Sequence, residues 1–338
     1  MKRTLIIFVL FSILVSFNSY GGWFDKTVCV ETDAQERGGI VYLPNETEPF
    51  TGKNLCEYEN GQYKSQGKLK DGKLDGKFTG WYENGQMRFY GNFKDGKEDG
   101  KWTWWYENGQ IQEEGNYKDG KLDGKFTQWN KDGQIKLEVN YKNHKKEGKE
   151  TTWYENGQIE TEITHNKLKG KKTSWYQSGE IKSENNYKNN KKEGKETTWY
   201  ENGRVKSEKN YKNGYKEGKF SVWYENGQIK SENNYTFDDI DGIQTSWYEN
   251  GQKKLEIIYS KKEYKKTSWY DNGQKEAEEN RKDRKLDGKR TTWYKNGQIK
   301  SENNFKNGKK EGKSTIWHED GQIKSVSNYK DGKSIVTE

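Results

Sequence analysis

One short sequence recurs through most of the chain: a Trp followed by Tyr-Glu-Asn-Gly, as in WYENGQIKSENNY at 223–235. We number each copy from its Trp as position 0. Copies follow one another every 24 residues, except for two steps of 22 residues, and a degenerate first copy, EYENGQ, has Glu57 at position 0. The Trp at position 0 occurs at Trp81, Trp105, Trp129, Trp153, Trp175, Trp199, Trp223, Trp247, Trp269, Trp293 and Trp317. A fixed period of this length indicates about twelve repeats, each packed on its neighbours.

Each repeat contains strong turn signals. Position +4 is Gly in every copy, and the residue before it is usually Asn or Asp. Asn-Gly between β-forming segments such as TTWYE and QIKSE predicts a hairpin with a two-residue type I′ turn, which needs positive φ at both central residues. A longer loop such as KDGKLDGK follows, and both two-residue deletions, before Trp175 and before Trp269, can be placed in it. The sequence therefore predicts an all-β fold, an elongated single-layer antiparallel β-meander or solenoid of about twelve 24-residue β-hairpin repeats.

The composition indicates a thin core. Only 28% of the residues are hydrophobic and 34% are charged, which by itself is compatible with disorder. However, 14% are aromatic, with 14 Trp and 23 Tyr, and the net charge of +8 is small for 338 residues. We therefore expect a folded chain in which aromatic contacts replace a thick aliphatic core.

The predicted turn assigns side chains to two faces. With a two-residue turn, positions that sum to seven pair across the hairpin. Tyr at +1 then faces Ile at +6, and Tyr at +12 faces Gly at −5, on one apolar face. Trp at 0 lies on the opposite face, where it pairs with position +7. On that same face, Thr at −2 pairs with Glu at +9. A bulge in the strands would shift this register and exchange the faces.

The predicted face with Trp carries a candidate binding ladder. Position +7 is basic in eight of eleven copies, where the Trp at 0 is expected to pair with a cation; Gln112, Glu160 and Glu276 are the exceptions. These cations are Arg88, Lys136, Lys182, Lys206, Lys230, Lys254, Lys300 and Lys324. The alternative is that Trp and Lys only cover each other and stabilise a thin sheet.

The chain start is typical of an exported protein. Met1-Lys2-Arg3 is basic, Leu5 to Phe17 is apolar, and small residues precede a cleavage position after Gly21. We expect residues 1–21 to be a signal peptide, residues 22–40 an N-terminal leader and residues 41–338 the repeat array. The protein would then lie in the periplasm, on the cell surface or outside the cell. Cys29 and Cys56 could form a disulfide there, or remain free thiols.

Residues for catalysis or metal binding are not clustered in the sequence. The three histidines, His144, His165 and His318, stand at unrelated repeat positions. The recurrent Glu at +2 and +9 favours structural pairing, and the DGKxDGK loops lack the ligand density of a calcium site. We therefore expect no enzyme activity, no metal and no cofactor.

The sequences WYENGQIKSENNY and YKNNKKEGKETTWYENG, with their copies, resemble the bacterial MORN-variant repeat, a relative of membrane occupation and recognition nexus repeats. The leading YLPNETEPFTGKNLCEYENGQ is similar to the degenerate first unit common in such proteins. The resemblance covers nearly the whole chain after the predicted signal peptide and implies the repeat fold. Bacterial members often carry the label of antitoxin components of toxin–antitoxin modules, which implies binding and neutralising a toxin. An exported start fits poorly with a cytoplasmic toxin.

Several functions remain open from the sequence. The first is an exported, non-catalytic scaffold that binds another protein through the Trp/Lys ladder. The second is the antitoxin role, which rests on the resemblance. Association with membrane lipid or glycan is a further alternative. Nucleic acid is an unlikely partner, because Lys and Glu alternate along the chain and do not form a basic patch.

Overall fold

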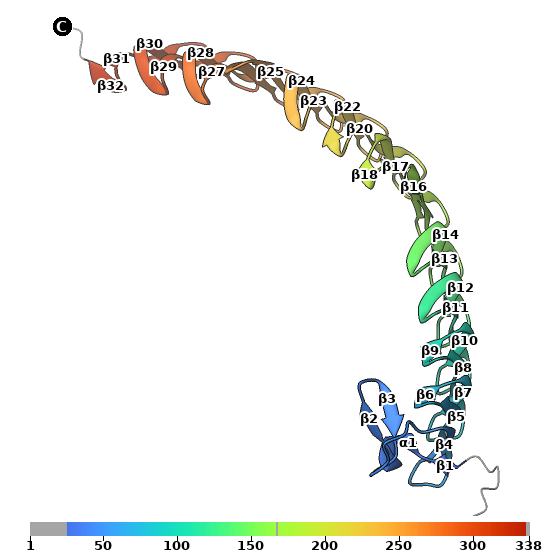
Figure 1. Cartoon of the computed structure of the whole chain (residues 1–338). Helices are drawn as coiled ribbons and strands as arrows, with labels where there is room; N and C mark the ends of the chain where they lie inside the picture. Colours follow the sequence, from blue (N-terminus) through green and yellow to red (C-terminus); the bar gives the residue numbers. More distant parts are fainter. Residues whose placement is uncertain (1–25, 167, 336–338) are drawn as a thin grey trace, which may run out of the picture. The chain divides into compact units, whose positions relative to one another are not determined.

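The computed structural model describes residues 26–166 and 168–335 (Figure 1). The chain divides into two compact units, Met1–Gly100 and Lys101–Glu338. Strands make up most of both units, and the one helix among the described residues, α1 (Val30–Asp33), has four residues. No helix in the described ranges is long and apolar enough to cross a membrane. The prediction of an all-β, antiparallel repeat fold is confirmed.

The first unit combines repeat hairpins with an irregular N-terminal part. Its strands are β1 (Thr27–Val28), β2 (Gln35–Arg37), β3 (Ile40–Tyr42), β4 (Gly52–Glu57), β5 (Tyr63–Lys70), β6 (Lys73–Leu74), β7 (Gly76–Trp81), β8 (Met87–Lys94) and β9 (Lys97–Glu98). Strands β2 and β3 form a separate hairpin, whereas β1 runs parallel to β4. Leu43, Phe50 and Leu69 form a small buried core. Cys29 and Cys56 form a disulfide that ties the chain before α1 to β4.

The predicted signal peptide, residues 1–21, lies outside the described residues. Of the predicted leader, residues 26–40 contain β1, α1 and β2, and β3 begins at Ile40. The first repeat hairpin consists of β4 and β5, and includes Glu57 at position 0.

The second unit consists of repeat hairpins, which follow one another in chain order (Figure 1). The strands are β10 (Gly100–Trp105), β11 (Ile111–Lys118), β12 (Lys121–Trp129), β13 (Ile135–Lys142), β14 (Lys145–Trp153), β15 (Ile159–His165), β16 (Gly170–Trp175), β17 (Ile181–Lys188), β18 (Lys191–Lys192), β19 (Gly194–Trp199), β20 (Val205–Lys212), β21 (Tyr215–Lys216), β22 (Gly218–Trp223), β23 (Ile229–Thr236), β24 (Asp239–Trp247), β25 (Lys253–Ser260), β26 (Glu263–Trp269), β27 (Lys275–Lys282), β28 (Lys285–Trp293), β29 (Ile299–Lys306), β30 (Lys309–Trp317), β31 (Ile323–Lys330) and β32 (Lys333–Ile335). From β11 onward, strands that follow one another pair antiparallel, except that β17 pairs with both β18 and β19, and β20 with both β21 and β22.

The turn after each Trp differs from the predicted type I′ turn. In the repeat at Trp223, the Gly227 N–H donates to the Tyr224 carbonyl at 2.9 Å, and the Tyr224 N–H donates to the Gln228 carbonyl at 2.8 Å. Gly227 has φ 92°, whereas Asn226 is not among the residues with positive φ. The loop is therefore a three-residue turn whose Gly forms a bulge. Asn226 Oδ1 accepts the Gln228 N–H at 2.8 Å, which holds Asn226 in this geometry.

The two-residue turns with two positive φ angles occur at the other end of the strands. Lys118 pairs with Lys121, and between them Asp119 and Gly120 have φ 51° and 75°. This is the type I′ geometry. The segment predicted to be the longer loop is therefore the tighter turn, and the lengths of the two connections are the reverse of the prediction.

A bulge follows the two-residue turn in most repeats. Between β11 and β12, the register shifts between the pairs Tyr117↔Leu122 and Gly115↔Phe126, which leaves two additional residues on β12. In the shortened connection before Trp269, β25 and β26 pair without interruption from Leu255↔Ser268 to Ser260↔Glu263. The two-residue deletion there therefore removes the bulge and leaves the strands intact.

The register confirms half of the predicted pairing. In the repeat at Trp223, Ser221 at −2 pairs with Glu232, and Gly218 at −5 pairs with Tyr235, both as predicted. A register shift next to Trp223 then pairs it with Ile229 at +6. The predicted pairing of Trp with +7, and of Tyr at +1 with Ile at +6, is wrong. The reason is that the three-residue turn pairs 0 with +6, while −1 pairs with +8. Position +7 therefore has no partner on the opposite strand and forms a bulge.

Two faces result, because side chains alternate along a strand. Trp at 0, Ile at +6, Thr at −2 and Glu at +9 share one face, which we call the tryptophan face. Tyr at +1, Lys at +7 and Tyr at +12 lie on the other, the tyrosine face. The second unit has one apolar cluster, Leu122, Phe126 and Val139, on the tyrosine face among its described residues.

Candidate functional site: two side-chain rows on opposite faces

The tryptophan face carries a row of half-buried apolar side chains. Each Trp at 0 pairs with the residue at +6 of its own repeat, and that residue also lies next to the following Trp. The second contact is visible where +6 is Lys: Lys253 Nζ is 5.2 Å from the Trp269 ring centroid, and Lys275 Nζ is 5.5 Å from that of Trp293. Trp and +6 residues therefore alternate across the strands.

We call this row the tryptophan stripe. It consists of Trp129, Ile135, Trp153, Ile159, Trp175, Ile181, Trp199, Val205, Trp223, Ile229, Trp247, Lys253, Trp269, Lys275, Trp293, Ile299, Trp317 and Ile323. Every Trp in it is half-buried, and Ile181 and Ile323 are 38% and 62% exposed. The stripe is thus a largely apolar surface, interrupted by Lys253 and Lys275, that remains partly open to solvent.

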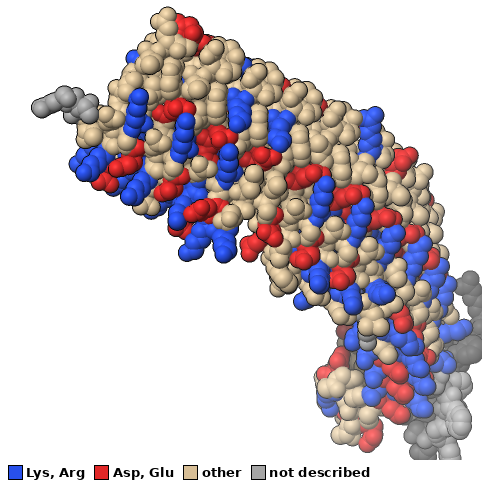
Figure 2. All heavy atoms as spheres, turned by 90° about the horizontal axis from the view of Figure 1, so that it is seen from above, with Lys and Arg blue, Asp and Glu red and all other residues tan. Residues whose placement is uncertain are grey.

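A ladder of ion pairs runs beside the stripe on the same face. Lys at −4 lies diagonally across from Glu at +9, and the two form an ion pair in eight repeats of the second unit. The pairs are Lys101–Glu114, Lys125–Glu138, Lys149–Glu162, Lys171–Glu184, Lys195–Glu208, Lys219–Glu232, Lys265–Glu278 and Lys289–Glu302. Basic and acidic side chains stand in neighbouring rows on the side seen in Figure 2.

The ion pairs neutralise the border of the stripe. A hydrogen bond from Lys275, with a further one from Lys265, holds the pKa of Glu278 below its ordinary value. Each exposed pair contributes about 0–1 kcal/mol to stability. This ladder was not predicted from the sequence, although the correctly predicted pairing of −2 with +9 makes Lys at −4 a diagonal neighbour of Glu at +9.

On the tyrosine face, the predicted cations contact Tyr at +1, so the prediction that they pair with Trp is wrong. Their terminal groups lie 5.2–5.8 Å from the ring centroid of that Tyr. The contacts are Arg88 with Tyr82, Lys182 with Tyr176, Lys206 with Tyr200, Lys230 with Tyr224, Lys254 with Tyr248 and Lys300 with Tyr294. Lys136 and Lys324 belong to repeats with Asn130 and His318 at +1, where no Tyr ring is present. The predicted ladder is therefore divided between two faces.

The Tyr at +1 also links each repeat to the next. Its hydroxyl donates to the backbone carbonyl of the following Trp at 2.8–3.0 Å. These bonds in the second unit are Tyr106–Trp129, Tyr154–Trp175, Tyr176–Trp199, Tyr200–Trp223, Tyr224–Trp247, Tyr248–Trp269, Tyr270–Trp293 and Tyr294–Trp317. Burial, with the nearby carboxylates of Glu225 and Glu249, raises the pKa of Tyr200. The Tyr/Lys row therefore has a structural role between repeats.

The histidines make separate local contacts. His165 Nε2 lies 2.5 Å from Glu150 Oε2, and His144 Nδ1 accepts the Leu122 N–H at 3.3 Å. His318 closes its own turn through its backbone. The described residues contain no group of three or more His, Cys, Asp or Glu suited to a metal ion. The absence of enzyme activity and of a cofactor stays a prediction.

Comparison with protein families gives matches over more than half of the chain. The model described as MORN repeat variant matches residues 74–95, 98–119, 122–143, 146–167, 168–189, 192–213, 216–236, 240–261, 286–307 and 310–331. The copies at Glu57 and Trp269 lie outside these ranges, and the hairpin before Trp269 lacks the bulge. The bacterial and antitoxin parts of the predicted resemblance go beyond this match and stay predictions.

Comparison with other proteins adds little. No curated protein matches the chain. Among solved structures, "Crystal Structure of TcdB2-TccC3" is 9% identical with a TM-score of 0.19, and the match covers 83% of this chain and 18% of that chain. "Crystal Structure of TcdB2-TccC3 without hypervariable C-terminal region" is 11% identical with a TM-score of 0.19, over 83% and 17%. The chain thus spans less than a fifth of the length of those chains, and TM-scores this low do not indicate a shared fold.

Proposed function

Because the chain belongs to the family of MORN repeat variants, we propose that its repeat scaffold is an exported, non-catalytic surface that binds another protein through the tryptophan stripe. The observation that carries this proposal is the stripe itself, a half-exposed apolar row bordered by ion pairs. Protein interfaces concentrate binding energy in aromatic residues at a centre surrounded by polar groups. A Trp with an ion pair beside it recurs in seven of the nine repeats of the stripe.

The charges near the stripe favour a protein over a polyanion as the partner. Lys at −4 is already paired with Glu at +9 in eight repeats, for example Lys219 with Glu232 at 2.5 Å. A surface with balanced charges does not supply the unpaired cations on which nucleic acid binding depends. A partner that covers the stripe instead gains from removing Trp and Ile side chains from water.

The test replaces stripe residues by a residue that the chain itself uses there. Lys253 and Lys275 occupy +6 in two repeats, so the triple variant Ile181→Lys, Ile229→Lys and Ile299→Lys should fold. The full chain would be immobilised and exposed to envelope and secreted fractions, with bound proteins identified by mass spectrometry. We expect one stoichiometric protein with the wild type and at least a tenfold loss with the triple variant, or about 1.4 kcal/mol.

The matched control lies on the tyrosine face of the same three repeats. Replacement of Lys182, Lys230 and Lys300 by Ser should leave capture unchanged. Equal capture by the wild type and the stripe variant would contradict the proposal. If no protein were enriched, binding to anionic lipid vesicles and to glycans would be measured next.

Toxin neutralisation is a narrower form of the same proposal, and it rests on the family resemblance. It predicts that a neighbouring gene encodes a protein that harms cells unless this chain is co-expressed. Toxicity that persists during co-expression would remove it. Export is tested separately, by detection of the chain in the periplasmic or medium fraction after truncation of residues 1–21 and without truncation.

A further inference from the structure

One two-residue turn differs from the equivalent turns of the other repeat hairpins in the described parts of the chain. Ten such turns between strands of the repeat hairpins, from β5 onward, have positive φ at both central residues. In nine of them the first central residue is Asp or Asn: Asp71, Asp95, Asp119, Asn143, Asn189, Asn213, Asp283, Asn307 and Asp331. In the tenth, between β23 and β24, it is Phe237 with φ 48°. Asp and Asn tolerate this left-handed conformation, whereas it strains a bulky aromatic residue.

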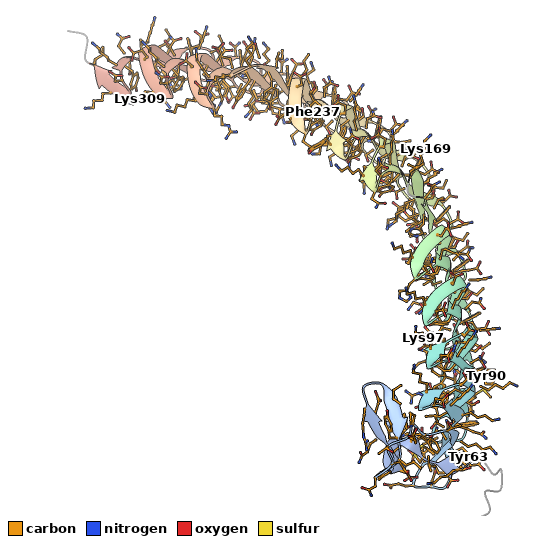
Figure 3. The ribbon with its side chains drawn as sticks, viewed as in Figure 1. Tyr63, Tyr90, Lys97, Lys169, Phe237 and Lys309 are labelled. Atoms are coloured by element: carbon orange, nitrogen blue, oxygen red, sulfur yellow. A yellow bond between two sulfur atoms is a disulfide. The ribbon has the colours of Figure 1, made fainter. Side chains whose placement is uncertain are left out.

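The Phe237 ring is not buried in the protein. Phe237 is 65% exposed, and Tyr215, from the preceding two-residue turn, is 48% exposed. Their ring centroids are 6.2 Å apart with an interplanar angle of 67°. Phe237 is labelled in Figure 3. The chain therefore keeps two aromatic rings in contact with each other and with water, at a backbone position unsuited to one of them.

The charge of this turn is also reversed. Residues 236–241 read TFDDID, with three Asp and no basic residue, whereas the equivalent segments 188–193 and 306–311 read KNNKKE and KNGKKE. Asp238 Oδ1 accepts the Lys216 N–H at 2.7 Å, and Asp241 Oδ2 accepts the Thr236 hydroxyl at 3.3 Å. Neither Asp239 nor Asp241 takes part in an ion pair with another described residue.

We propose that Phe237 and Tyr215, with Asp239 and Asp241, form a docking point for an arginine-bearing segment of a partner protein. A guanidinium stacks on aromatic faces and donates hydrogen bonds to carboxylates, and this turn offers both together. The chain has a net charge of +8, whereas this turn is acidic, so the turn attracts a cationic segment more strongly than the basic turns of the other repeats do. The turn lies at the opposite strand ends from the three-residue turns, so this site adds to the stripe proposed above.

The experiment uses the full chain and a fluorescein-labelled peptide of four Arg-Gly repeats, with binding measured by fluorescence anisotropy at low and physiological salt. We expect Phe237→Asn to bind about tenfold more weakly, because one of the two cation–π contacts is lost and Tyr215 loses the ring that packs against it. The same variant should have a higher Tm, because Asn suits the left-handed turn. The double variant Asp239→Lys and Asp241→Lys should also lose binding while keeping both rings.

Two controls separate this site from general attraction. Asn307→Phe places an exposed ring at the equivalent position of a basic turn, and should gain no affinity for the peptide. The triple stripe variant described above should bind the peptide like the wild type. Failure of the docking proposal and failure of the proposed stripe function can therefore be distinguished. Unchanged affinity in Phe237→Asn, or a lower Tm, would overturn the inference, as would equal binding of a four-repeat Glu-Gly peptide.

Discussion

At the scale of single residues, the Tyr at +1 shows how one side chain joins neighbouring repeats. Tyr224 donates its hydroxyl to the carbonyl of Trp247, and Lys230 lies over its ring at 5.2 Å. Asn226 adds a parallel bond from its side chain to the Glu249 carbonyl at 3.1 Å. From the sequence, this Tyr was expected to belong to an apolar face. The structure shows that its polar end is equally important, because it satisfies a backbone acceptor of the next repeat.

The hydroxyl bond leads to a prediction at this scale. Tyr224→Phe keeps the ring and the Lys230 contact but removes the donor to Trp247. We expect a loss of about 1 kcal/mol, the net contribution of one hydrogen bond, with faster amide exchange around Trp247. Tyr215→Phe is the control, because its exposed side chain makes ring contacts only, and its stability should be unchanged. Identical exchange in both variants would show that the bond does not stabilise the repeat contact.

At the scale of elements, the bulge after the two-residue turn accounts for both repeat lengths. With the bulge, a repeat has 24 residues; the hairpin before Trp269 lacks it and is two residues shorter. Side chains alternate with a period of two, so a change of two residues keeps every side chain on its face, whereas a change of one exchanges the faces. This explains why both irregular steps between repeats are shorter than the usual 24 residues by two residues and not by one.

A deletion in β28 tests that explanation. Removal of Asp287 and Gly288 should give β28 the uninterrupted pairing of β26. We expect a folded protein that loses about 1 kcal/mol, mainly because Asp287 no longer accepts the Asn307 N–H at 3.0 Å. Removal of Gly288 alone should unfold this hairpin, because it moves the side chains that follow to the wrong face. Circular dichroism and hydrogen exchange of residues 275–306 would compare the two, and equal damage would refute the explanation.

At the scale of the whole molecule, the two units are stabilised differently. The first unit has a buried cluster at Leu43, Phe50 and Leu69 and the disulfide between Cys29 and Cys56. The second unit has no cysteine, and its most regular buried position is the Thr or Ser at −2, as in Thr127 and Ser221. Its stability is therefore distributed over contacts between successive repeats, as is typical of repeat proteins.

Loss of the disulfide should consequently affect one unit only. The bond closes a loop between residues 27 apart in sequence, which corresponds to about 3–4 kcal/mol in the chain-entropy model. We expect the double variant Cys29→Ala and Cys56→Ala to increase hydrogen exchange in residues 26–100 and leave residues 101–335 unchanged. A reductant should reproduce this in the wild type and have no effect on the variant. Equal loss of protection throughout would contradict separate stabilisation.

The sequence by itself determined the period, the hairpins, the antiparallel all-β fold and the pairing of −2 with +9 and −5 with +12. These follow from local composition, because Gly positions and β-forming flanks recur in every repeat. Only the tertiary structure decided the turn type, and with it the partner of every Trp. Asn-Gly fits both a two-residue and a three-residue turn, and the choice depends on the Asn side chain reaching Gln at +5 and the following repeat. That choice moved Lys to the tyrosine face and Ile beside the Trp, so the physical surface available for binding became visible only in three dimensions.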